Sequence, residues 1–212
     1  MLKKLDKLRY KLQSGFLKIF AHIKIHPYPF WVVVEPTTFK LKGDSYYEVR
    51  DIIQAGDIIL RGYDKYLDGY FIAGKYSHAS LYVGGVDEKI IHSMTPDVQY
   101  TDLVSFMRAD RVAVIRFPQL EHSNIMVILQ RAKEKIDVPY DYDFIFEEED
   151  KVSRFFSCSE LIYYIMKPYQ YITNWKLKET SVLFGLIKRD VFFPDDILPT
   201  TDNTNGKVIW SK

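Results

Sequence analysis

The sequence predicts an α+β domain in which an antiparallel sheet packs against a helix that carries the chain's single cysteine. Short runs of β-branched and aromatic residues, separated by glycine and proline turns, occupy residues 58–116. Apolar residues with helical spacing follow over 124–136, and again from Cys158 to the residue before Pro168. The presence of both periodicities in one chain is the basis for this fold class.

The composition is that of a globular protein with a substantial core, and it excludes several classes of function. The 212 residues suit one domain with appendages, and 47% of them are hydrophobic. A net charge of +1 argues against a nucleic-acid binder. One cysteine rules out an internal disulfide and any cysteine-rich zinc or iron–sulfur site. Because the net charge is close to zero, we expect no nucleic-acid partner.

Residues 1–26 differ from the rest of the chain and predict a basic amphipathic helix. Seven lysines and arginines stand there against Asp6 alone, and leucine, isoleucine and phenylalanine recur at helical spacing. His26-Pro27-Tyr28-Pro29 would end the helix, so we assign residues 27–212 to the main domain. Two interpretations stay open: the helix attaches to an anionic membrane surface, or it packs on its own domain with its lysines in water.

No secretory signal or membrane-spanning run is recognisable. The longest apolar runs near the start are Ile19–Ala21 and Phe30–Val34, far below the roughly 20 residues of a membrane span. The expected location is the cytoplasm, with the periphery of a membrane as the place that the basic helix would favour.

The strands are expected in chain order, each bounded by turn residues. Residues 30–50 predict a strand or an extended pair, and Gly56-Asp57 predicts a turn into a strand over 58–61. Residues 62–76 are interpreted as a loop. Gly84-Gly85 is a hairpin signal between strands over 79–83 and 89–93. Further extended pieces are expected over 98–100 and 111–116, with a helical turn starting at 101–103.

Two helices and several loops are expected after the strands. Ser123 is a candidate N-cap for the helix over 124–136. Residues 139–143 predict a loop, and the acidic run 147–150 is interpreted as a solvated loop. Residues 169–212 look irregular, with a turn over 193–196 and a polar stretch over 200–206.

Cys158 opens the second helix, because Leu161, Ile162 and Ile165 follow it at the spacing of one buried helical face. Unpaired N–H groups and the positive end of the helix dipole surround a thiol at this position. This environment predicts a lowered thiol pKa and a nucleophilic thiolate. The alternative is that Cys158 is a small buried hydrophobic residue.

Two histidines lie on strands that the hairpin brings together. His78 starts the first strand and His92 lies on the facing strand, so the two rings can sit close on one face of the sheet. Cysteine hydrolysis needs a thiolate, an imidazole that carries protons, and a polar group that orients the imidazole. Cys158, His78 and His92 supply these three residue types. His22, His26 and His122 are interpreted as surface residues, and Asp57 as a turn or packing residue.

The order of several motifs resembles a known family. The histidine strand comes first and the cysteine helix last, whereas ordinary papain-like enzymes have the cysteine first. This order is similar to that of the circularly permuted NlpC-type papain-like proteins of the YiiX/YycO group, which overlaps in fold with the lecithin:retinol acyltransferase-like enzymes. The resemblance covers about residues 52–200 and rests on Gly56–Leu60, Tyr76–Ala79, Tyr82–Gly84, Ile91–Ser93, Tyr140–Phe144, Phe156–Leu161 and Pro194–Asp196.

The resemblance implies a papain-like fold and a set of site residues. Cys158 would be the nucleophile, His78 the general base that becomes the general acid, and His92 the group that holds His78. Its third position is often acidic in the permuted bacterial members, and the histidine here resembles the acyltransferase branch. The N–H of Cys158 would contribute to an oxyanion site. Tyr140 and Asp141 would bind substrate, although a turn role is equally open.

We expect a cysteine-dependent hydrolase or acyltransferase that acts on an amide or ester bond of a peptide or lipid-linked acyl substrate. No cofactor is expected. No metal site is expected either, since the chain has no His-Glu-x-x-His pattern and no zinc-ligand spacing. The alternative is a non-catalytic lipid- or peptide-binding module, or a host-interaction module, on the same fold.

Overall fold

The structure is a computed structural model that describes residues 39–64, 72, 74–142, 155–182, 187–200 and 205–212, together with 24–27, 30–33 and positions 11 and 15. Its main body is a six-stranded antiparallel sheet with the strand order β10-β7-β3-β4-β5-β6. The sheet strands are β3 (Ile58–Gly62), β4 (His78–Gly84), β5 (Lys89–Met94), β6 (Asp97–Asp102), β7 (Arg111–Arg116) and β10 (Lys207–Ser211).

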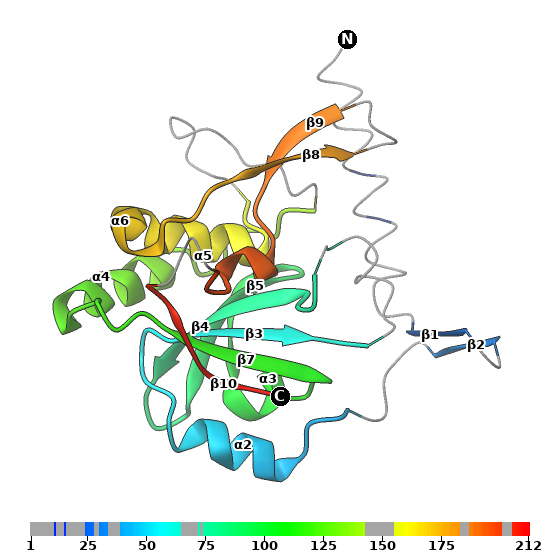
Figure 1. Cartoon of the computed structure of the whole chain (residues 1–212), viewed down its shortest axis with the longest axis horizontal. Coiled ribbons are helices and arrows are strands. Elements are labelled where there is room, and N and C mark those ends of the chain that lie inside the picture. Colours follow the sequence, from blue (N-terminus) through cyan, green and yellow to red (C-terminus); the bar gives the residue numbers. More distant parts are fainter. Residues whose placement is uncertain are drawn as a thin grey trace.

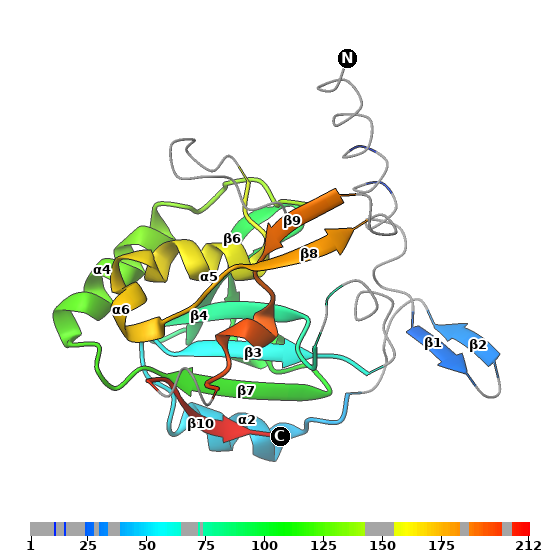
Figure 2. The same cartoon turned by 45° about the horizontal axis from the view of Figure 1, so that its top comes forward.

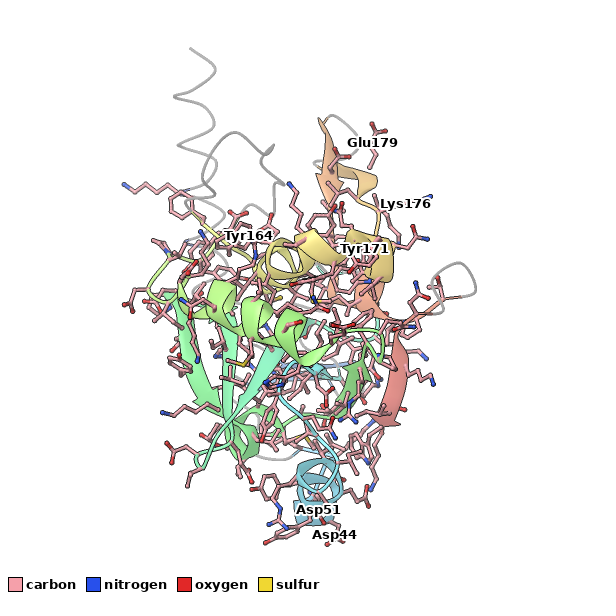
Figure 3. All side chains as sticks on the ribbon, turned by 90° about the vertical axis from the view of Figure 1, so that its left-hand side faces the viewer. Asp44, Asp51, Tyr164, Tyr171, Lys176 and Glu179 are labelled. Carbon is pink, nitrogen blue, oxygen red and sulfur yellow. The ribbon has the colours of Figure 1, made fainter. Side chains whose placement is uncertain are left out.

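Helices cover both faces of this sheet (Figures 1 and 2). One face, here called the α5 face, carries α4 (His122–Lys133) and α5 (Cys158–Met166), followed by the short elements η2 (Lys167–Tyr169) and α6 (Gln170–Thr173). The other face, here called the α3 face, carries α2 (Gly43–Arg50) and α3 (Leu103–Phe106). Figure 3 shows the two sides at once, with Asp44 and Asp51 beside α2 at one end and Tyr164 and Tyr171 of α5 and α6 toward the other.

Alternation along the central strands supplies a separate core to each face, because successive side chains of a strand point to opposite sides. Ile58 and Leu60 lie in the cluster that includes Leu161 and Ile165 of α5. Ile59 lies instead in the cluster of the α3 face, with Phe106 of α3. The unbroken burial of β3, and of β4 from His78 to Tyr82, therefore reflects cover on both faces of the sheet.

The predicted α+β class and the antiparallel sheet packed against the cysteine-bearing helix are confirmed. All five strands expected over 58–116 are present, and α5 packs on β4 and β5. The hairpin signal is also confirmed, since Gly84 and Gly85 have φ angles of 82° and 91°. Glycine adopts this left-handed region without the steric penalty that other residues meet there.

Two local predictions were wrong. The helix α4 begins at His122, and its N-cap is Glu121 rather than Ser123, since Glu121 and Asn124 form a reciprocal capping box. Residues 43–50 form the helix α2 rather than extended chain, and its buried positions Ser45 and Val49 are four residues apart, on one helical face. Only one of these two buried residues, Val49, is apolar, and a short polar helix of that kind leaves little periodicity in the sequence.

The C-terminal part is more ordered than the pattern indicated. Residues 169–212 contain the strands β8 (Lys178–Val182) and β9 (Ile187–Val191), the turn η3 (Pro194–Ile197) and β10. β8 and β9 pair with each other in a separate hairpin, and β10 extends the main sheet beside β7. The expected turn over 193–196 is confirmed by η3. The polar stretch 200–206 and the acidic run 147–150 lie wholly or largely outside the described residues.

The N-terminal helix expected over 1–26 lies largely outside the described residues. Positions 11 and 15 are helical, in agreement with the prediction, whereas the end of the stretch forms the strand β1 (Lys24–Pro27), paired with β2 (Phe30–Val33), so the helix prediction was wrong for residues 24–26. Within the part of the chain that the structure describes, no helix combines the length and apolarity needed to cross a membrane.

Candidate active site

The start of α5 is held by a capping box. The hydroxyl of Ser157 accepts a hydrogen bond from the backbone N–H of Glu160 at 3.4 Å, and the Glu160 carboxylate accepts one from the N–H of Ser157 at 2.7 Å. Glu160 is therefore a backbone partner in the capping box rather than a proton carrier. The capping box fixes the direction in which the first helical residue, Cys158, points.

Cys158 lies against the first residues of β4. Its Sγ is 4.0 Å from the carbonyl oxygen of Ser77, and the backbone N–H groups of Ala79 and Ser159 also point to the sulfur. Ser77 and Ala79 are the two chain neighbours of His78. The structure therefore places the thiol beside the backbone that presents the predicted general base.

The expectation of a lowered thiol pKa was wrong for this structure. Cys158 is 2% exposed, and burial raises the pKa of its thiol to about 11. The N–H groups of Ala79 and Ser159 and the charge of Arg61 act in the opposite direction, but they are outweighed. Burial penalises the thiolate more than the helix start stabilises it, so the resting thiol is protonated.

His78 and His92 form a buried hydrogen-bonded pair. Nε2 of His78 lies 2.8 Å from Nδ1 of His92, and the two side chains are 8% and 5% exposed. Phe106 of α3 touches both rings, with centroids 5.7 Å from His78 and 6.0 Å from His92. The hairpin thus brings the two histidines together, as its pattern predicted.

Both imidazoles are uncharged in this environment. Burial, followed by the charges of Arg61 and His92, lowers the pKa of His78 well below its usual value. Burial and then the charge of Arg61 lower the pKa of His92 to about 3. An unprotonated imidazole is the form that can accept a proton from a thiol.

The thiol and the histidine pair approach β4 from different sides. Strand alternation and the contact with Phe106 place His78 and His92 on the α3 face, whereas Cys158 belongs to the helix of the α5 face. Within the described residues, no hydrogen bond joins Sγ to either imidazole. The three predicted residues therefore converge only at the beginning of β4, where the thiol contacts the backbone of the two residues that flank His78.

Tyr140 and Asp141 lie beside the start of α5. Residue 140 pairs with Phe156 in a parallel bridge, and the N–H of Asp141 donates to the Phe156 carbonyl at 3.0 Å. Ser93 Oγ also donates to that carbonyl, at 2.5 Å. Burial, and next the charge of a Cys158 thiolate, raise the pKa of Tyr140 well above its usual value. The phenol therefore keeps its proton within electrostatic reach of the thiol.

Arg61 is a site residue that the sequence reasoning missed. It lies on β3 directly opposite His78, is 7% exposed, and acts on the pKa values of His78, His92 and Cys158. One signal was available: an arginine closes the apolar strand run Ile58-Ile59-Leu60, where a cation is costly to bury.

Other polar residues near the site have structural roles. The Asp57 carboxylate forms two hydrogen bonds with the Arg116 guanidinium, at 2.8 and 2.7 Å, and accepts the N–H of Gln54, which agrees with its interpretation as a turn or packing residue. The Asp195 carboxylate accepts the N–H groups of Lys75 and Tyr76, both at 2.8 Å, and so ties the segment before β4 to η3. His122 is exposed at the start of α4.

The sequence also matches the model of a known protein family. The model described as permuted papain-like amidase enzyme, YaeF/YiiX, C92 family, matches residues 52–186. The chain belongs to this family. It is therefore an enzyme of the papain-like cysteine amidase class, and the family resemblance drawn from the motif order is confirmed. The match includes Cys158, His78 and His92 within its bounds.

A solved structure with the same fold supports the assignment. The crystal structure of the metalloprotein yiiX from Escherichia coli O157:H7 matches with a TM-score of 0.58 and 17% sequence identity, over 75% of this chain and 97% of that one. At this identity the likeness concerns the fold. No curated protein sequence that was compared with this chain matches it. Among the described residues of this chain, no three His, Cys, Asp or Glu side chains gather in a way that could hold a metal ion.

Proposed function

We propose that this member of the permuted amidase family cleaves amide or ester bonds through an acyl-enzyme on Cys158, with His78 as the proton carrier and His92 as its positioning partner. One observation carries the proposal: the thiol of Cys158 lies against the backbone on both sides of His78, whose ring is hydrogen-bonded to His92. Nucleophile, base and orienting group are the three parts that thiol catalysis requires.

The hydrogen bond between the two rings determines the working tautomer. If Nε2–H of His78 donates to Nδ1 of His92, then Nδ1 of His78 keeps its lone pair for the thiol proton. Nδ1 of His78 makes no other hydrogen bond within the described residues. When His78 takes the proton, Nε2–H continues to donate to His92 and the imidazolium stays oriented.

The reaction starts from neutral partners. A protonated thiol and an unprotonated imidazole are the forms that burial favours here. As the substrate carbonyl arrives, the S–H proton passes to Nδ1 of His78, and the sulfur attacks the carbonyl carbon. The proposal therefore requires Sγ and Nδ1, which approach β4 from different sides in the resting structure, to come into contact in this step.

The rest of the cycle follows from the same groups. The carbonyl oxygen becomes an oxyanion near the N–H of Cys158, which lies in the first helical turn, where no carbonyl of the helix can accept it. His78 returns its proton to the leaving amine or alcohol, and the C–N or C–O bond breaks. Water, or another acceptor, then attacks the thioester with His78 as base, and Cys158 is released.

Tyr140 is the residue proposed to hold the substrate carbonyl from the other side. Its phenol stays protonated, because burial and the negative charge of a Cys158 thiolate both raise its pKa. A protonated phenol can donate a hydrogen bond to the developing oxyanion, where charge forms. Asp141, anchored through its N–H to Phe156, positions this segment.

The proposed substrates are peptide amides and lipid-linked or N-acylated amides and esters. Aromatic residues close to the start of α5, which include the buried Phe156 and Tyr142 and the partly exposed Tyr140, favour a substrate with apolar groups near the scissile bond. The family assignment favours an enzyme over the non-catalytic binding module. The buried thiol is the one observation that favours the module, and the experiment below separates the two.

The test uses p-nitrophenyl acetate as a small acyl donor. We expect a burst of p-nitrophenol equal to the enzyme concentration, and intact and peptide mass spectrometry should place the acetyl group on Cys158. In Cys158→Ala the burst and the adduct should both be absent. His122→Ala is the matched control, since it removes an exposed histidine that is not part of the proposed site and should behave as the wild type.

An acetyl group on any residue other than Cys158, or an equal burst in Cys158→Ala, would remove the proposed nucleophile. Absence of any adduct in a folded wild-type protein, even after prolonged incubation, would favour the binding module.

A further inference from the structure

A buried arginine beside the histidine pair is unusual enough to need an explanation. Placing a guanidinium in a protein interior costs several kcal/mol, unless close polar partners compensate. Arg61 is 7% exposed and lies in the middle of the sheet, between β7 and β4. The chain has other ways to fill this position, since Ile58, Ile59 and Leu60 of the same strand are apolar.

The side chain of Arg61 crosses the histidine pair. In the sheet register Arg61 stands opposite His78 on β4, and its Nη2 lies 3.6 Å from the sulfur of Met94 on β5, the strand beyond. The guanidinium therefore extends from β3 over β4 to the strand that carries His92.

One aromatic ring links the three groups. The Arg61 guanidinium stacks on Phe106 with Cζ 4.5 Å from the ring centroid, and the same ring contacts His78 and His92. Tyr63 lies on the other flank, with its centroid 5.6 Å from Cζ. Because a planar cation stacks well on aromatic faces, this arrangement holds the charge in a fixed place beside the two imidazoles.

We infer that Arg61 is a positioning residue of the amidase, whose fixed charge adds to burial in disfavouring protonation of the His78–His92 pair, so that His78 stays available as a base in acidic solution. The inference rests on the proposed function, since it concerns the base of that site.

The groups that face the pair define the electrostatics. Arg61 approaches from β3, His78 and His92 face each other from β4 and β5, and Cys158 approaches the backbone of His78 from α5. The short helix α3 contributes the uncharged ring of Phe106. Among these groups of the described residues, Arg61 carries the permanent charge, and after burial it lowers the pKa of His78 and His92, and it also lowers the pKa of Cys158.

The experiment is the pH profile of acylation by p-nitrophenyl acetate between pH 3 and 8, for the wild type, Arg61→Met and Arg61→Lys. Methionine keeps length and apolar contacts but removes the charge, and lysine keeps the charge. In Arg61→Met the acidic limb should move to higher pH, and the rate at pH 3.5, relative to its own plateau, should fall about three- to tenfold. In Arg61→Lys the limb should stay near that of the wild type.

Arg50→Met is the matched control, because Arg50 also stacks on a ring, that of Tyr47 at 4.9 Å, but on the surface helix α2. It should leave the profile unchanged. A purely structural Arg61 would lower the plateau in both Arg61 variants without moving the limb, and that result would overturn the inference.

A second measurement needs no variant. Titration of the wild-type imidazoles by nitrogen NMR should find His78 and His92 neutral at pH 6, and an ordinary titration near pH 6.5 for either ring would overturn the inference. The two proposals fail in different ways: a wild type without a Cys158 acetyl adduct removes the proposed function, whereas an adduct with an unmoved limb removes only the role of Arg61.

Discussion

The start of α5 and the His78–His92 pair are both buried, but burial moves their pKa values in opposite directions. It raises the pKa of the Cys158 thiol to about 11, and it lowers the pKa of His92 to about 3. Both effects have one cause, because a buried site disfavours whichever form carries charge. An acid and a base in such a site rest as a neutral couple, and charge separates only as the bond to substrate forms.

The two regions also differ in how they are held. Cys158 is placed by the first turn of one helix and by a capping box that spans four residues of the chain. The histidine pair is placed by pairing among β3, β4 and β5 and by Phe106 of α3. Substitutions near the thiol should therefore change only the local structure of the helix start. Substitutions in the histidine pair should instead change the rate of proton transfer from the thiol to His78.

The largest effect is expected from removal of the base. His78→Ala should lower the rate of acylation by p-nitrophenyl acetate about a hundred- to ten-thousandfold, because no other group accepts the thiol proton. Stopped-flow detection of p-nitrophenol measures the loss. Retention of more than a tenth of the wild-type rate would break the assignment of His78, provided that circular dichroism shows a folded variant.

Alkylation of the resting thiol should be slow at neutral pH. With a thiol pKa of about 11, the thiolate fraction rises about tenfold for each pH unit from 7 to 10, and the rate with iodoacetamide should rise in the same way. At pH 7 the rate should be about a hundredfold below that of an exposed cysteine. A rate that is already at its plateau below pH 8, and falls in His78→Ala, would show an ion pair in the resting enzyme and contradict the neutral couple.

Loss of the positioning partner should cost less than loss of the base. His92→Ala should lower the acylation rate about ten- to a hundredfold, because His78 remains but its ring and tautomer are no longer held. In His92→Asn the side-chain amide can still accept the hydrogen bond, so part of the rate should return. Equal rates for the alanine and asparagine variants would show that the contact acts by packing alone.

The smallest effect is expected at the helix cap. Ser157→Ala removes the hydroxyl that accepts the N–H of Glu160 and should lower the free energy of unfolding by about 1 kcal/mol. Urea denaturation measures this change. Ser123→Ala is the comparison, since Ser123 lies inside α4 and is exposed, and it should change the stability by less than half as much.

Much of the fold and part of the site could be predicted from local pattern. The hairpin between β4 and β5 followed from Gly84 and Gly85 and the apolar runs beside them, and it brought His78 and His92 together. The start of α5 followed from the spacing of Leu161, Ile162 and Ile165, all fully buried. Where the periodic signal was weak, as in α2 and in the hairpin of β8 and β9, the prediction failed.

The charge state of the site could not be predicted in this way. The helix start alone indicated a thiolate at Cys158, and nothing in residues 155–165 reveals that β4 and residues 139–142 cover the thiol. Arg61 was overlooked for a related reason. Its neighbours in space, His78, Met94 and Phe106, are separated from it by 17 to 45 positions in the chain.

The sequence by itself determined the order of the elements, the residues that can react and the family to which the chain belongs, because these depend on residue type and on spacing along the chain. Only the tertiary structure decided that the thiol and the imidazoles are neutral, that Glu160 is a capping group and that Arg61 faces the histidine pair. Burial and electrostatic contact depend on distances between segments that are far apart in sequence, and a pattern along the chain does not contain those distances.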